Sequence, residues 1–160
     1  MAAIIQYRLT GGASNSNPDL SLGGTSSSTQ IVTDTPKSIF DDVSDSELTT
    51  GDVEYRAVDI FNAGDDTATS VAIYISADTL STSTEIDIGA VASPLGSTTS
   101  VADESTAPTG VTFSHYNSAS RLSLPDIPVN NYARVWIRRT VTAGGTNIKT
   151  DTCELKVVAA

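Results

Sequence analysis

Apolar and polar residues alternate along most of the chain after residue 50, and this alternation predicts β-strands. The clearest run covers residues 132–141, where Ala133, Val135 and Ile137 fall on one parity. A period of two residues is typical of a strand with one buried face. Arg139 occupies the same parity as the apolar residues, so we expect the strand to leave the core at that point.

A second alternating run closes the chain over residues 152–157. Cys153, Leu155 and Val157 share its apolar parity. A glycine-containing loop, residues 143–146, separates this run from the preceding one. A short loop of this kind predicts that the last two strands pair with each other as an antiparallel hairpin.

Shorter runs of the same type come earlier and are separated by turns rich in glycine, proline, asparagine and aspartate. They cover residues 54–61, 71–76, 86–88, 111–113 and 122–124. Residues 54–61 carry apolar side chains on both parities, as expected for a strand that is covered on both faces or bulged once. No helical period of useful length is present. About seven short strands with frequent turns predict an all-β sandwich or small barrel over residues 51–160.

The first fifty residues have a different character. Two glycine- and serine-rich stretches, residues 11–18 and 23–28, cannot bury enough apolar area to offset the ordering of their backbone. The segment nevertheless contains a strand-like piece, residues 5–9, and several isolated apolar anchors. We therefore interpret residues 1–50 as an extended arm with one or two short strands, which lies either on its own domain or on a neighbouring subunit.

The composition supports a β fold and a strongly acidic surface. Serine and threonine replace much of the usual charged fraction, and both suit strands and turns better than helix interiors. The formal net charge is −10, which disfavours binding to nucleic acid or to an anionic membrane. No apolar run approaches the length of a membrane span, and no signal-peptide pattern begins the chain, so we expect synthesis in a cytoplasm.

Charge is unevenly distributed along the chain. Residues 1–130 carry four basic side chains against seventeen acidic ones, whereas residues 131–160 carry five basic side chains against two acidic ones. Two interpretations remain open. The basic strands could contact an acidic surface of another copy, or they could form an arginine–carboxylate network within one fold, which we favour.

The residues needed for catalysis or metal binding do not form a recognisable pattern. His115 is the only histidine and lies in a polar stretch, and Cys153 is the only cysteine, so an intrachain disulfide is excluded. There is no zinc-type spacing and no phosphate loop. The sequence therefore predicts a non-enzymatic protein without a cofactor. Solvated turn carboxylates are the favoured interpretation of the acidic clusters, with an opportunistic calcium ion as the alternative. The clustered acids are Asp41, Asp42, Asp45, Glu47, Asp65 and Asp66.

Trp136 is the most unusual residue of the predicted strands, because Arg134 and Arg138 flank it on the same parity. It either covers the second face of the sandwich under arginine stems or forms an interface hot spot, in which tryptophan and arginine are enriched. Together with the apolar parity of the N-terminal strand, these residues form the candidate interface. Its members are Ile5, Tyr7, Leu9, Arg134, Trp136 and Arg138.

Three segments resemble recurrent segments of tailed-bacteriophage virion proteins. Residues 51–62 contain Gly-Asp-Val-Glu-Tyr-Arg followed by a terminal asparagine, and residues 107–114 and 135–141 are similar to two further segments of these proteins. The resemblance implies a virion structural component, foremost a capsid decoration (cement) protein on the capsid surface. It implies an immunoglobulin-like or jelly-roll-like β-sandwich that bridges subunits of the major capsid protein, and a closed ring such as a homotrimer is expected at a threefold point.

Two alternatives to a decoration protein remain. The chain could be a tail or head–tail component, or an adhesion module that binds a host receptor or glycan. The latter would need exposed aromatic and amide side chains on loops, which residues 116–117 and 130–132 could supply.

Overall fold

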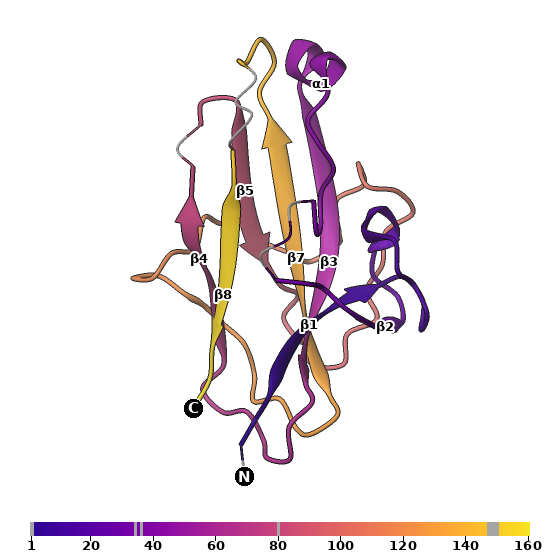
Figure 1. Ribbon diagram of the computed structural model, residues 1–160, viewed down its shortest axis with the longest axis vertical. Helices are drawn as coiled ribbons and strands as arrows, with labels where there is room; N and C mark the ends of the chain where they lie inside the picture. The colour runs from indigo at the N-terminus through magenta and orange to yellow at the C-terminus, as the bar shows by residue number, and fades with distance from the viewer. Residues whose placement is uncertain (1, 34, 36, 80, 147–150) are drawn as a thin grey trace.

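Two antiparallel β-sheets pack face to face in the computed structural model, which describes residues 2–33, 35, 37–79, 81–146 and 151–160 (Figure 1). The larger sheet has the strand order β2-β1-β3-β7-β5 and the smaller sheet has the order β6-β4-β8. The strands are β1 (Ile5–Thr10), β2 (Ser26–Gln30), β3 (Asp52–Asn62), β4 (Ala72–Asp78), β5 (Thr84–Gly89), β6 (Leu122–Ser123), β7 (Tyr132–Val141) and β8 (Cys153–Val158). The all-β sandwich predicted from the alternation is therefore confirmed.

The hairpin predicted for the last two strands is wrong. β7 lies between β3 and β5 in the larger sheet, whereas β8 pairs with β4 in the smaller one. The chain between β7 and β8 thus crosses from one sheet to the other. An alternating pattern identifies a strand, but a short polar loop does not decide which strand becomes its neighbour.

Strands β3 and β7 form the centre of the larger sheet, with Asp52 opposite Val141 at one end and Phe61 opposite Tyr132 at the other. One face of this pair packs on the smaller sheet and forms the core. The core residues are Val58, Ile60, Ala68, Val71, Ile73, Ile88, Leu124, Ile127, Ala133, Val135 and Ile137. Burying these side chains supplies the main driving force for folding.

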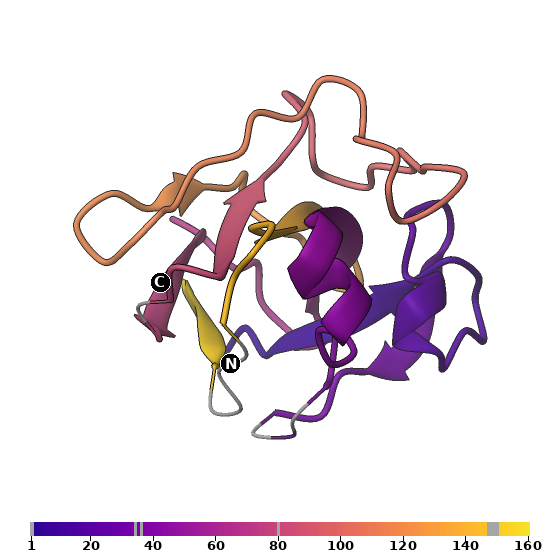
Figure 2. The same ribbon diagram turned by 90° about the horizontal axis from the view of Figure 1, so that it is seen from above.

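Over β3, β7 and β5, the opposite face of the larger sheet is covered by the long connection between β5 and β6, as Figure 2 shows. The backbone contact is close, because a Cβ placed on Gly89 would lie 2.4 Å from the Thr112 carbonyl oxygen. This second cover explains why residues 54–61 are apolar on both parities. Residues 111–113, which the pattern predicts as a strand, belong to this irregular cover.

The segment expected to form an extended arm lies on its own domain. β1 is inserted between β2 and β3, with Tyr7 opposite Ile60, and Leu9 is almost fully buried. A short helix, α1 (Asp45–Thr50), follows and is started by a capping box between Ser44 and Glu47. Residue 50 is therefore not a boundary between an appendage and the sandwich, because strands from both sides of it pair in one sheet.

Several backbone groups at the edges of the sheets bond within the chain. The Tyr7 hydroxyl accepts from the Val157 amide at 2.9 Å on the free side of β8. On β5, Ile88 exchanges hydrogen bonds with Ser114, and on β2 the Ser28 amide donates to the Ala13 carbonyl. Edges covered in this way resist pairing with strands of other molecules.

Replacing Tyr7 by phenylalanine should lower the free energy of unfolding by about 1–2 kcal/mol, because the Val157 amide at the edge of β8 loses its acceptor. Urea denaturation measures this change. Tyr116→Phe is the matched control, because the Tyr116 hydroxyl forms no hydrogen bond with any described residue. Equal stability of the two variants would contradict the role given to Tyr7.

Candidate functional site

Trp136 and Arg134 do not lie on the surface of the chain. Both are fully buried on the face of β7 that the segment between β5 and β6 covers. Trp136 lies opposite Gly89 on one neighbouring strand and Ala57 on the other, two small residues that leave room for the indole. The interface hot-spot interpretation is therefore wrong for this pair, and Trp136 fills the second face of the sheet.

Arg134 forms a buried ion pair with Asp59 on the adjacent strand. Its Nε and Nη2 atoms donate to the two carboxylate oxygens of Asp59 at 2.8 and 2.9 Å. Its Nη1 atom donates to the carbonyl oxygens of Gly24 and Thr99 at 2.8 and 3.0 Å. Burial raises the pKa of Asp59, and the hydrogen bonds from Arg134 oppose this effect. The pair thus ties the sheet to two covering loops.

The other arginines of β7 are also paired within the chain. Arg138 contacts Asp87 at 2.5 Å and lies over the Phe113 ring. Arg139 is bound by Glu54, and it also donates to the Asp41 carbonyl at 2.6 Å. These contacts confirm the internal arginine–carboxylate network that we favoured. They also explain why β7 continues past Arg139 rather than leaving the core there.

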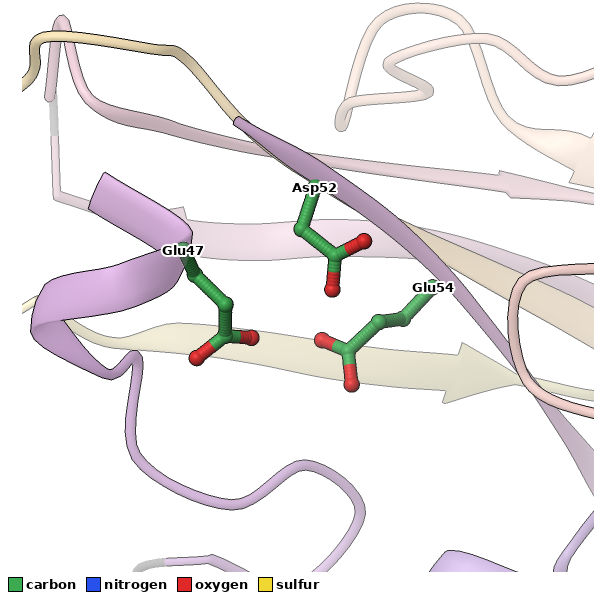
Figure 3. A group of neighbouring side chains, drawn as sticks. All are labelled: Glu47, Asp52 and Glu54. Atoms are coloured by element: carbon green, nitrogen blue, oxygen red, sulfur yellow. The ribbon is translucent and has the colours of Figure 1, made fainter. Parts of the chain in front are cut away.

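Three carboxylates gather beside α1, where Glu47, Asp52 and Glu54 point toward one another (Figure 3). One oxygen from each lies within 4.8 Å of the others. Arg139 forms ion pairs with Glu47, at 3.6 Å, and with Glu54. Arg56 forms a further ion pair with Glu54 at 3.8 Å. Because two guanidinium groups occupy the position of a counter-ion, the arrangement is that of an ion-pair network rather than a cation site.

The pKa values in this network are shifted in opposite directions. Burial is the largest influence on Glu54 and raises its pKa, although Arg139 and Arg56 oppose it. Burial also raises the pKa of Glu47, but hydrogen bonds with Ser44 together with Arg139 outweigh burial, so that its pKa is lowered. Of the other acids considered for calcium, Asp41 contacts Arg139 at 3.1 Å and Asp42 contacts Lys37 at 2.5 Å.

The N-terminal candidates Ile5, Tyr7 and Leu9 also face inward. Ile5 and Tyr7 pack against the core, and Leu9 is buried. The outward face of β1 therefore belongs to the other parity, which includes Gln6 and Arg8. The sequence contains the signal for this assignment, because an alternating strand directs its polar parity away from the core.

This outward parity forms an accessible surface that the sequence-based candidates missed. We call it the β1 patch and define it by Ile4, Gln6, Arg8 and Phe61. The Arg8 guanidinium lies 3.4 Å from the centre of the Phe61 ring. Its Nε and Nη2 atoms donate to the Gln6 side-chain oxygen at 3.2 and 2.9 Å. Arginine is one of the residue types enriched in interface hot spots.

His115 and Cys153 lack the partners of a nucleophilic site within the described part of the chain. The His115 ring lies 2.9 Å from the Ile86 carbonyl oxygen and 3.7 Å from Asp78, and no described hydroxyl or thiol hydrogen-bonds to it. Burial, followed by the nearby carboxylates, raises the pKa of the Cys153 thiol to about 12. A thiol of this kind is a poor nucleophile at neutral pH.

The amide and aromatic residues considered for glycan binding make contacts within the chain. The Tyr132 hydroxyl donates to the Ser97 carbonyl at 3.1 Å, and Asn131 accepts from the Tyr132 amide. Asn117 caps its own turn by accepting from Ala119 and Ser120. These polar groups stabilise the loops that carry them.

The helices in the described ranges are too short and too polar to cross a membrane. No protein-family model, curated protein or solved structure matches the chain.

Proposed function

We propose that the chain is a non-enzymatic structural component of a tailed-phage virion, a decoration protein that binds the outside of the capsid and bridges subunits of the major capsid protein. The proposal begins from the resemblance of residues 51–62, 107–114 and 135–141 to segments of such proteins. Those three segments are far apart in the sequence, so their arrangement in space bears on whether they belong together.

One observation carries the proposal: the three segments contact one another. Residues 51–62 contain β3 and residues 135–141 belong to β7, and these strands are neighbours at the centre of the larger sheet. The third segment covers them, with the Phe113 ring 5.5 Å from the Tyr55 ring and 5.2 Å from the Arg138 guanidinium. The resemblance thus falls on a single structural unit, which favours a shared fold over chance similarity of short motifs.

The surface supports a role in binding to a preformed partner. The three arginines of β7 form ion pairs within the chain. The charged groups that remain on the described surface are therefore mainly carboxylates. Hydrogen bonds within the chain at the edge strands β2, β5 and β8 disfavour added strands, so side-chain surfaces are the favoured contact. A protein of this design binds a complementary, basic face of a large assembly without polymerising on its own.

Purified protein should bind saturably to capsids assembled in its absence and should raise the temperature at which they open. A ligand that binds only the assembled state stabilises it by about 2.7 kcal/mol when its free concentration is about 100 times its Kd. Co-sedimentation and thermal disruption of the capsids measure the two effects. Protein that stays in the supernatant at every concentration would contradict the proposal.

A further inference from the structure

The β1 patch has an apolar centre that is open to solvent. Ile4 is 57% exposed, and among the large apolar side chains in the described ranges only Val32 is more exposed. Phe61 is half-buried and lies directly opposite Gln6 on the adjacent strand. The Ala63 amide donates to the Ile4 carbonyl at 2.8 Å, which places Ile4 diagonally beside Phe61. The exposed Ile4 side chain and the accessible part of Phe61 together offer apolar area to a partner.

Arg8 lies at one end of this centre and forms no close ion pair with any described residue. Asp59, directly opposite on the adjacent strand, interacts with Arg8 electrostatically, but its two carboxylate oxygens are bound by Nε and Nη2 of Arg134. Stacking on Phe61 and two bonds to Gln6 fix the guanidinium. A guanidinium has five N–H donors, and only two are used here, so Arg8 is prepared to bind a carboxylate.

An exposed carboxylate lies at the other end. Asp65 accepts from the Ala2 amide at 2.9 Å through Oδ1 and forms no ion pair among the residues the structure describes. Ala2 and Arg8 lie six positions apart on the same parity, roughly 20 Å along an extended chain. The surface therefore runs from a carboxylate through an apolar centre to a guanidinium.

We infer that the β1 patch binds a second copy of this chain across a twofold axis. A twofold contact joins residue i to residue j and residue j to residue i. An axis through the Ile4 and Phe61 region superposes the two apolar centres and brings Arg8 of each copy to Asp65 of the other. The intrachain hydrogen bonds at the edges of β2, β5 and β8 disfavour the competing route of pairing by strand addition. This inference stands apart from the proposed function, since it uses only the charges and exposure of the patch.

Sedimentation equilibrium of the full chain tests the pairing in 0.15 M NaCl. The wild type should show a reversible equilibrium between one and two chains. Arg8→Glu and Asp65→Arg should each weaken association by at least about tenfold, because each change occurs twice in a twofold contact. The double variant, Arg8→Glu with Asp65→Arg, should restore the wild-type constant. Lys156→Glu makes the same charge change as Arg8→Glu on an exposed position of β8 and should leave association unchanged.

Three outcomes would overturn the inference. The first is a single-chain mass at all concentrations up to about 1 mM, which is on the order of the Kd of the weakest specific complexes. The second is a three-chain mass. The third is a double variant that associates as weakly as the single variants. Thermal unfolding of each variant, followed by circular dichroism, separates a loss of association from a loss of folding.

Discussion

Replacing Asp59 by alanine should lower the free energy of unfolding by about 3–5 kcal/mol, because the fully buried Arg134 then keeps its charge without a counter-ion. The loss extends beyond one contact. Arg134 also fixes the Gly24 and Thr99 carbonyls, so a displaced guanidinium releases two loops that cover the sheet. Urea denaturation with a two-state fit measures the change.

Asp87→Ala is the matched control for this experiment. Asp87 is also buried and also binds an arginine of β7, but the Arg138 side chain is 33% exposed and can regain water when its partner is removed. We expect this variant to lose only about 1 kcal/mol. A second test replaces both members of the buried pair, Asp59→Leu with Arg134→Met, and should recover much of the loss. An Asp59→Ala cost no greater than that of Asp87→Ala would contradict the account.

The Cys153 thiol should react with iodoacetamide about a thousandfold more slowly in the folded protein than in the unfolded chain at pH 8. Its pKa rises from 9.0 to about 12, and each unit removes about nine tenths of the reactive thiolate. Burial is the main cause, and Asp78, Asp151 and Glu154 add to it by disfavouring a further negative charge.

The measurement compares alkylation rates by mass spectrometry in the absence of urea and in about 8 M urea. This concentration is well above a typical unfolding midpoint, so the chain is unfolded. Since Cys153 is the only cysteine, the mass shift reports on this residue alone. Asp78→Asn removes one of the nearby negative charges and should speed the folded-state reaction. A folded-state rate within tenfold of the unfolded rate would show that the thiol is not protected in this way.

Alternation predicted the strands well, but it could not predict their partners. The runs at 54–61 and 132–141 became β3 and β7, since a period of two and β-branched residues already favour extended backbone. The pairing of β7 with β3 joins residues some eighty positions apart, and no local feature encodes it. Helix α1 was missed because six residues carry no helical period, although its capping box is present in the sequence.

The candidate interface was only partly predictable for a related reason. Parity along a strand shows which residues share a face, but not which face is covered. Arg134 and Trp136 fall on a polar-looking face that a long irregular segment buries, so they became structural. Arg8 falls on the same face of the larger sheet, but the covering segment does not bury this face at β1. The parity of Arg139 predicts that the strand leaves the core there, yet Glu54 on the neighbouring strand neutralises its charge.

Direct imaging of purified virus particles by electron cryomicroscopy tests the central claim, that this chain is a decoration protein, most directly. The account predicts density that fits the two-sheet sandwich on the outer surface of the head, in contact with more than one subunit of the major capsid protein, and missing from particles that lack the chain. Density at the tail, or particles with unchanged heads when the chain is absent, would contradict it.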